Sequence, residues 1–252
     1  MFRTLLRILA AMALLAPAAA AQTVDDVIAK NIEAHGGLQK IKSIQTIRTS
    51  GKLDVGFFRV AFQQENKRPD RVREEATIQG LTQLRAYDGK AGWQVSPFGG
   101  RKDPELLAQD DMKDLVVDAD IDGPLVDYKQ KGHRAELVGH DSVEGTDCYK
   151  VKLTLKNGDV RLYYFDADSF LEIKVETQTM IRGAIQETET FYGDYDEVNG
   201  LYFPFAHETG EKGDLNHVKY TIEKLEINVP LEDKLFSMPP TKPEAKSAGG
   251  AK

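Results

Sequence analysis

Apolar and polar side chains alternate at every second residue through most of the sequence, and this pattern restricts the fold most strongly. Phe58, Val60 and Phe62 share one side of a segment whose other side carries Arg59 and Gln63. A period of two places successive side chains on opposite faces of a β-strand, so each such segment is predicted to be a strand with one buried face. Two further apolar sides of this kind are Tyr149, Val151, Leu153 and Leu155, and then Leu171, Ile173 and Val175.

Short turn signals separate these predicted strands. Asp88-Gly89, Asn157-Gly158 and Asn199-Gly200 are dipeptides typical of two-residue β-hairpins. Such links can join only antiparallel neighbours, because a parallel crossover needs a dozen residues or more. The chain is therefore predicted to form one long antiparallel meander.

A change of phase marks the last predicted strand. Its apolar positions run through Val218, Tyr220 and Ile222 and then continue at Leu225 and Ile227. One extra residue must lie between the two series, which predicts a β-bulge within a long strand.

Two stretches have the spacing of helices instead. Thr23 with Asp26 three residues later resembles a capping box, and Gly36-Gly37 is expected to end that helix. The second helix is expected over Pro104 to Val117, with Asp103 as its N-cap.

These elements predict the architecture. Two modest helices cannot cover the apolar face of a sheet with eight or more strands. We expect a mainly β (α+β) fold, in which a strongly curved antiparallel sheet forms an incomplete β-barrel and helices cover its concave face. Incomplete covering would leave an apolar cavity on that face.

The two ends of the chain differ in composition from the middle. Arg3 and Arg7 precede the apolar run 8–15, and small alanines lead to Ala21, which together predict a signal peptide over residues 1–21. An uncleaved membrane anchor is disfavoured, because the run is much shorter than the ~20 residues that span a bilayer. The mature protein is predicted to begin at Gln22, with a folded domain over residues 22–239 and a disordered tail over 240–252. No cysteine lies near the cleavage site, so we expect a soluble periplasmic protein that is not lipidated.

Charge and cysteine content exclude several classes of function. The formal net charge is −7 and there is no long basic run, which argues against nucleic acid as a partner. Cys148 is the single cysteine, so no intramolecular disulfide can form. We expect its thiol to be inert or partly covered.

The sequence has no complete motif for metal binding or catalysis. Asp118-x-Asp120-x-Asp122-Gly123 matches the first half of a calcium loop, but Lys129 stands where the twelfth-position glutamate belongs. A solvated acidic turn is the alternative that this substitution favours. The five histidines lack the spacing of a zinc site, and no Gly-x-Ser-x-Gly elbow is present. We therefore predict no catalytic residue, no metal and no cofactor.

A series of short motifs resembles the outer-membrane lipoprotein-sorting group of the LolA/LolB-like superfamily. In order along residues 23–239 they are Ile32-Glu33-Ala34-His35-Gly36-Gly37-Leu38, Lys67-Arg68-Pro69-Asp70, Tyr87-Asp88-Gly89 with Gly92-Trp93, Gly123-Pro124-Leu125 before Tyr128, Tyr163-Tyr164-Phe165-Asp166, Asp194-Tyr195 with Gly200 and Pro204, and Leu235-Phe236-Ser237-Met238-Pro239. The resemblance implies an incomplete barrel, lidded by helices, whose hydrophobic cavity carries lipoprotein acyl chains across the periplasm. It also implies an inner-membrane extraction complex and an outer-membrane acceptor as partners.

Strand parity and the aromatic residues together nominate a cavity wall. For each residue taken alone, ordinary core is the favoured interpretation, so the prediction of a cavity wall concerns the set. It predicts a non-enzymatic periplasmic binder or carrier of lipid or acylated lipoprotein; the alternative is a sensor or assembly factor whose half-barrel binds a protein. The predicted ligand-cavity residues are Phe58, Val60, Phe62, Trp93, Tyr149, Val151, Leu153, Tyr164, Leu171, Ile173 and Val175.

Overall fold

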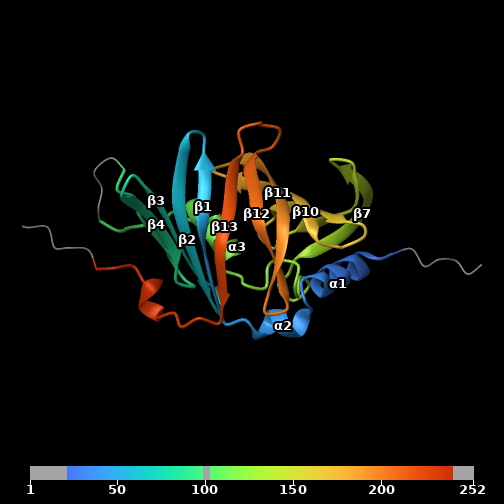
Figure 1. The fold of residues 1–252 in the computed structure, drawn as a ribbon, viewed down its shortest axis with the longest axis horizontal. Coiled ribbons are helices and arrows are strands. Elements are labelled where there is room, and N and C mark those ends of the chain that lie inside the picture. The colour runs from blue at the N-terminus through green and yellow to red at the C-terminus, as the bar shows by residue number, and fades with distance from the viewer. Residues whose placement is uncertain (1–21, 99–102, 241–252) are drawn as a thin grey trace, which may run out of the picture.

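The computed structural model describes residues 22–98 and 103–240, and within them one antiparallel sheet of thirteen strands dominates (Figure 1). The predicted signal peptide and the predicted tail beyond Pro240 lie outside the described residues. The strands are β1 Thr46–Val55, β2 Phe58–Lys67, β3 Arg71–Ile78, β4 Leu81–Tyr87, β5 Gly92–Val95, β6 Glu105–Leu106, β7 Arg134–Val143, β8 Thr146–Thr154, β9 Val160–Asp166, β10 Glu172–Ile181, β11 Ala184–Val198, β12 Leu201–Glu211 and β13 Val218–Ile227.

The order of the strands shows that the sheet stays open. It runs β6-β5-β4-β3-β2-β1-β13-β12-β11-β10-β9-β8-β7, so β6 and β7 form the two edges and the first and last strands pair in the middle. The sheet curves into a half-barrel, which confirms the predicted fold class.

In the described residues, three α-helices pack against this sheet: α1 Val24–Ala34, α2 Leu38–Ser43 and α3 Lys113–Asp118 (Figure 1). We call the face that contacts α1 and α3 the concave face and the other the convex face. Val27 and Ile28 of α1 pack with Val151 and Phe165, and Leu115 of α3 packs with Val72 of β3. Within the described segments, no helix has both the length and the apolar character needed to cross a bilayer.

The first helix forms as its sequence predicts. The Asp26 amide donates to the Thr23 hydroxyl at 3.2 Å, and the Thr23 amide donates to the Asp26 carboxylate at 2.9 Å. This reciprocal pair satisfies two backbone donors that have no partner within the helix. The helix ends before Gly36 and Gly37, both of which have positive φ.

The second predicted helix is largely wrong. Glu105 and Leu106 form β6 instead, where they pair with Gln94 and Trp93 of β5, and the α-helix begins only at Lys113. Pairing with an open sheet edge outweighed the helix-start signal at Pro104, because local propensity is weaker than tertiary hydrogen bonding. The sequence also gave no signal for α2, which has only six residues and no side-chain cap.

The predicted turn at Asn199-Gly200 and the predicted bulge are confirmed. Asn199 and Gly200 have φ of 55° and 77°, as a type I′ hairpin between β11 and β12 requires. In β13, Lys224 pairs with Ser50 and Ile222 pairs with Gly51, which leaves Glu223 as the extra residue. The bulge keeps Tyr220, Ile222 and Leu225 on the concave face.

Candidate functional site

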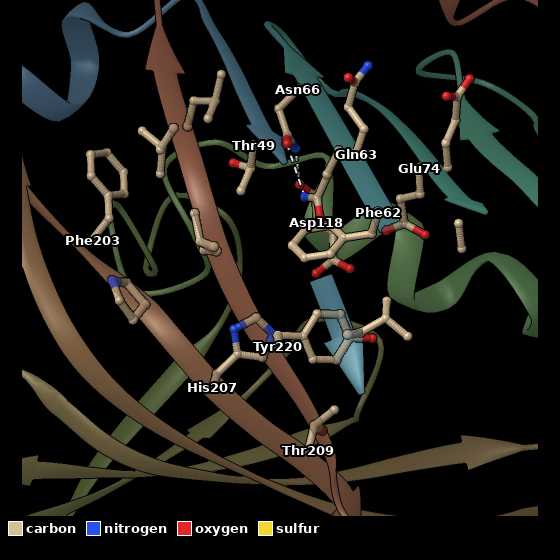
Figure 2. A pocket seen from close by; sticks show the side chains of 18 of the residues that line it. Thr49, Phe62, Gln63, Asn66, Glu74, Asp118, Phe203, His207, Thr209 and Tyr220 are labelled. Atoms are coloured by element: carbon tan, nitrogen blue, oxygen red, sulfur yellow. Dashed lines mark hydrogen bonds between the residues drawn. The ribbon is translucent and has the colours of Figure 1, made fainter. Parts of the chain in front are cut away.

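The concave face is hollow where β1 to β4 meet β11 to β13. A cavity of about 730 Å³ lies between these strands and the segment that follows α3. We call it the aromatic chamber, after Phe62, Phe203, His207 and Tyr220 (Figure 2). Its apolar lining comes mainly from β1, β12 and β13, and its polar lining mainly from β2 to β4. The apolar wall further includes Ile47, Leu53, Ile222 and Leu225, whereas Gln64, Asn66, Glu74 and Arg85 contribute to the polar wall.

Three rings from three strands stack inside this chamber. The Phe62 and Tyr220 rings meet edge to face with centroids 5.5 Å apart, and the His207 and Tyr220 rings stack at 4.3 Å. His207 and Tyr220 are paired residues on β12 and β13, so the sheet register sets their contact. Burial lowers the pKa of His207 to about 4, which keeps its ring neutral at pH 7. The stack therefore presents an uncharged aromatic surface.

A second cavity of about 750 Å³ adjoins the first. We call it the threonine chamber, because Thr177, Thr179 and Thr188 line it together with Arg161. The two chambers form one continuous hollow, since they share the lining residues Arg85, Asp118, Thr190, Tyr192 and Thr209.

Arg85 holds α3 against the boundary between the chambers. Its guanidinium donates two hydrogen bonds to the Asp114 carboxylate, at 2.7 and 2.9 Å, and one to the Asp111 carbonyl at 3.0 Å. The Glu74 carboxylate lies 3.5 Å from the same group. A bidentate arginine–carboxylate pair fixes orientation as well as distance, so β4 positions the helix.

Two carboxyl groups at this boundary resist ionisation. Burial and the nearby charge of Asp118 raise the pKa of Glu74 to about 8. Burial also raises the pKa of Asp118 to about 6, although the charge of Arg161 opposes this. Glu74 is therefore mostly protonated at pH 7, which lowers the charge of the chamber wall.

His35 fastens the end of α1 to the sheet. Its Nε2 lies 2.7 Å from the Glu172 carboxylate and its Nδ1 lies 2.8 Å from the Tyr202 carbonyl oxygen. Burial alone would lower the pKa of His35, but the Glu172 carboxylate outweighs it and the pKa rises to about 9. Next to it, a Cβ on Gly36 would lie 2.2 Å from the Gly200 carbonyl oxygen. The His-Gly-Gly motif thus joins α1 to the β11–β12 hairpin.

No protein-family model matches the sequence, and no curated protein shows a significant match. Solved structures do match the whole described fold. A LolA superfamily protein from Nitrosomonas europaea superposes with a TM-score of 0.58 at 14% identity, covering 85% of this chain and 97% of that one. This chain has a LolA-like fold.

Two further structures agree with this assignment. A DUF1329 family protein from Desulfovibrio piger superposes with a TM-score of 0.58 at 13% identity. The match covers 86% of this chain and 98% of the Desulfovibrio piger chain. A domain assigned to outer membrane lipoprotein-sorting proteins, from Vibrio parahaemolyticus, has a TM-score of 0.55 at 12% identity, with 83% and 97% covered. The predicted resemblance to LolA-like proteins is thus confirmed at the level of fold.

Two of the predicted cavity residues line the hollow of this LolA-like sheet. Phe62 lines the aromatic chamber and Val175 lines the threonine chamber. Phe58 and Val60 share the strand face of Phe62 but lie nearer the β1–β2 turn, where Val60 is buried and Phe58 is 52% exposed.

A second group lies beneath α1. Tyr149, Val151 and Leu153 of β8 face the concave side, but they pack in the cluster that contains Val27 and Ile28. The helix fills the space above them, so the structure places these three residues in packed core.

Three predicted residues lie on the convex face. The Trp93 indole N–H donates to the Phe236 carbonyl at 2.8 Å, and Tyr164 packs with Val143 and Cys148. Ile173 joins that same cluster because a register shift between Glu172 and Lys174 turns it away from Val175. The parity assignment of Ile173 is therefore wrong, since a bulge lies within the apparent alternation.

Leu171 lies outside the strands. It precedes β10, and its carbonyl accepts the Asp166 amide at 3.0 Å across the β9–β10 turn.

Sequence reasoning missed the polar residues of the site. Arg161 is in phase with Tyr163 and Phe165, and both of these are buried in the cluster under α1. A charged residue in phase with a buried face is itself a signal, because such residues are seldom placed there without a partner.

The acidic turn does not bring its carboxylates together. Asp122 pairs with Arg68 and with Lys42, the latter at 2.7 Å, while Asp120 pairs with Lys131. Separate cations thus neutralise the two side chains. Among the described residues, no group of three or more histidine, cysteine, aspartate or glutamate side chains is arranged to hold a metal ion.

Proposed function

We propose that this protein is a non-enzymatic periplasmic binder or carrier of lipid or acylated lipoprotein, acting in outer-membrane lipoprotein sorting. The observation that carries the proposal is the hollow on the concave face, which has one apolar wall. The aromatic chamber alone has a volume of about 730 Å³. This falls within the range of ~300–1,000 Å³ typical of small-molecule sites. The LolA-like fold supports the same function.

The energetics suit exchange with a membrane. Each buried methylene is worth about 0.8 kcal/mol, whether it lies in a bilayer or in a protein cavity. A chain therefore gains little by leaving the membrane, and loading and release both remain accessible. The direction of lipid transfer would be set by partner proteins. As these partners we propose an inner-membrane extraction complex and an outer-membrane acceptor.

Extraction of the purified protein with organic solvent, followed by mass spectrometry, tests the ligand class. Co-purified lipid or acylated peptide is the expected result. A lipid-free protein that instead captures one polypeptide would favour the alternative, a sensor or assembly factor that binds a protein through the half-barrel.

A matched pair of substitutions tests the cavity itself. Phe62→Glu should abolish binding of a neutral fluorescent acyl ester, because it places a charge beside the Tyr220 ring. Phe62→Ala should cost only ~1–2 kcal/mol in the free energy of unfolding, mostly the lost transfer energy, because the chamber side of the ring is unpacked.

Phe57→Glu is the control, since Phe57 is fully exposed in the β1–β2 turn. It introduces the same charge outside the cavity and should leave probe binding unchanged. A parent protein that never binds the probe, together with unfolding of Phe62→Ala, would make residue 62 ordinary core and remove the support for a carrier.

A further inference from the structure

The threonine chamber contains a half-buried cation, Arg161, with no carboxylate of the described residues at contact distance. Arg161 lines this chamber from β9, and its Nε–H is buried with no hydrogen-bond partner among the described residues. The guanidinium also interacts with the Tyr163 hydroxyl, two residues along the same strand. In the described part of the chain, no carboxylate lies within 4.0 Å of its guanidinium. Burial of an unpaired cation is costly unless another group completes its hydrogen bonds.

The other cations around the chamber already have partners. Arg85 pairs with Asp114 at 2.7 Å, Lys113 with Asp110 at 3.1 Å, and Arg182 with Asp111 at 2.7 Å.

Two acidic groups remain on the same lining. The carboxylate of Asp159 accepts the Asn157 side-chain amide at 2.7 Å and the Met180 backbone amide at 3.1 Å. Asp118 faces Arg161 from farther away, and burial raises its pKa to about 6. Arg161 is thus the one cation of this lining whose charge no described carboxylate meets at contact distance.

Threonine side chains line the same chamber wall as Arg161. Thr177 is the register partner of Arg161 on β10, and Thr188 lies beyond it on β11 as the partner of Thr177. Farther along the wall, the Thr190 and Thr209 hydroxyls bond to each other at 2.9 Å. Threonine hydroxyls can donate to an oxyanion, and arginine binds carboxylate or phosphate in a bidentate manner.

We propose that Arg161 binds the anionic head group of an amphiphile, a carboxylate or a phosphate, while the hydrocarbon chain extends into the aromatic chamber. This inference rests on the proposed function and adds the head-group chemistry to it. The head group is expected beside Thr177, on the side of Arg161 away from Asp118, whose charge would repel it. The shared lining of the two chambers gives the chain a continuous path.

Calorimetric titration at pH 7 with four probes tests the proposal. Dodecanoate and dodecyl phosphate carry the same chain as the neutral dodecanol, and inorganic phosphate carries the charge alone. The parent should bind both charged amphiphiles at least tenfold more tightly than dodecanol. Tenfold corresponds to ~1.4 kcal/mol, about the value of one charge-assisted hydrogen bond.

Arg161→Gln should remove this tenfold preference and leave dodecanol binding unchanged, whereas Arg161→Lys should keep part of it. Arg134→Gln is the matched control, because Arg134 is exposed at the start of β7, and it should bind like the parent. If Arg161→Gln fails to fold, the proposal is still tested by the preference of the parent for charged amphiphiles over dodecanol and by the reduced preference expected of Arg161→Lys.

Each contrary outcome has a distinct meaning. Equal affinity of the parent for all three chain compounds would overturn the anionic site and leave the lipid carrier standing. Inorganic phosphate that binds as tightly as dodecyl phosphate would show a small-anion site and overturn the amphiphile. If no chain compound binds the parent, the inference and the proposed function both fail.

Discussion

The hydrogen bonds of His35 determine its protonation state. Both ring nitrogens face acceptors, a carboxylate and a carbonyl oxygen, so both must carry protons. The imidazole is therefore an imidazolium ion in the folded protein, in agreement with its raised pKa of about 9. Glu172 is the complementary partner, and α1 is held to the sheet by this ion pair.

Stability should accordingly fall at alkaline pH. The folded-state pKa of His35 lies above the ordinary 6.5, so its contribution is complete below pH 6.5 and is lost as the pH rises through 9. Between pH 6 and 10 the parent should lose up to ~3 kcal/mol in the free energy of unfolding. His35→Gln should lack this loss, as measured by urea unfolding across the pH range.

His140→Gln provides the control, because His140 is 53% exposed on the edge strand β7. Its pH profile should follow that of the parent. An equal alkaline slope in the parent and in His35→Gln would contradict the assignment of the imidazolium.

At the residue level, the sequence predicted the apolar side of the site better than the polar side. Phe62 was found because its neighbours two residues away are apolar as well. Arg161 was missed because its role depends on which strands bring carboxylates near it, and that is set by sheet order. Asp118 was noticed only as part of an acidic turn, whereas in the structure it lies where the aromatic chamber meets the threonine chamber.

At the level of elements, the end of α1 depends on a close backbone approach. Gly36 has a φ of 106°, and any Cβ there would overlap the Gly200 carbonyl of the β11–β12 hairpin. Gly36→Ala should therefore force the helix away from the sheet. We expect it to cost at least ~3 kcal/mol in the free energy of unfolding, more than the ~1–2 kcal/mol that positive φ alone imposes on alanine.

Gly80→Ala separates the two effects. Gly80 also has positive φ, 78°, but an added Cβ would meet nothing within 4 Å. Chemical denaturation of both variants gives the comparison. Similar losses would mean that backbone strain, and not the clash with Gly200, decides the requirement for glycine.

Bulges explain why the two-residue period assigned side chains to the correct face of the sheet in β13 but not in β10. In β13 the extra residue is Glu223, and the polar Lys224 after it visibly breaks the apolar series of Tyr220 and Ile222. In β10 the extra residue is Ile173, which is itself apolar. The apolar series in the sequence therefore appears unbroken, although Ile173 lies on the convex face and Val175 on the concave face. Helix prediction failed near Pro104 for a related reason, since pairing with β5 involves residues distant in sequence.

At the level of the whole molecule, export is the prediction that lies outside the described residues. Arg3, Arg7 and the small residues before Gln22 predict cleavage after Ala21. Intact-mass measurement of protein from the periplasmic fraction should therefore show a chain that begins at Gln22. A mass that includes residues 1–21, recovered with membranes, would show an anchored protein instead.

The order of the strands has a consequence for how the chain reaches its native state. β1 pairs with β13, so the centre of the sheet joins segments about 170 residues apart, such as Gly51 and Ile222. Native contacts this distant raise the contact order and slow folding, because closing the chain costs entropy before the pairing stabilises it. β13 can take its place only after the twelve described strands that precede it in the sequence have been synthesised. The centre of the sheet therefore forms late, and a chain that still lacks β13 has its first twelve strands but not the pairing that joins the two halves of the sheet.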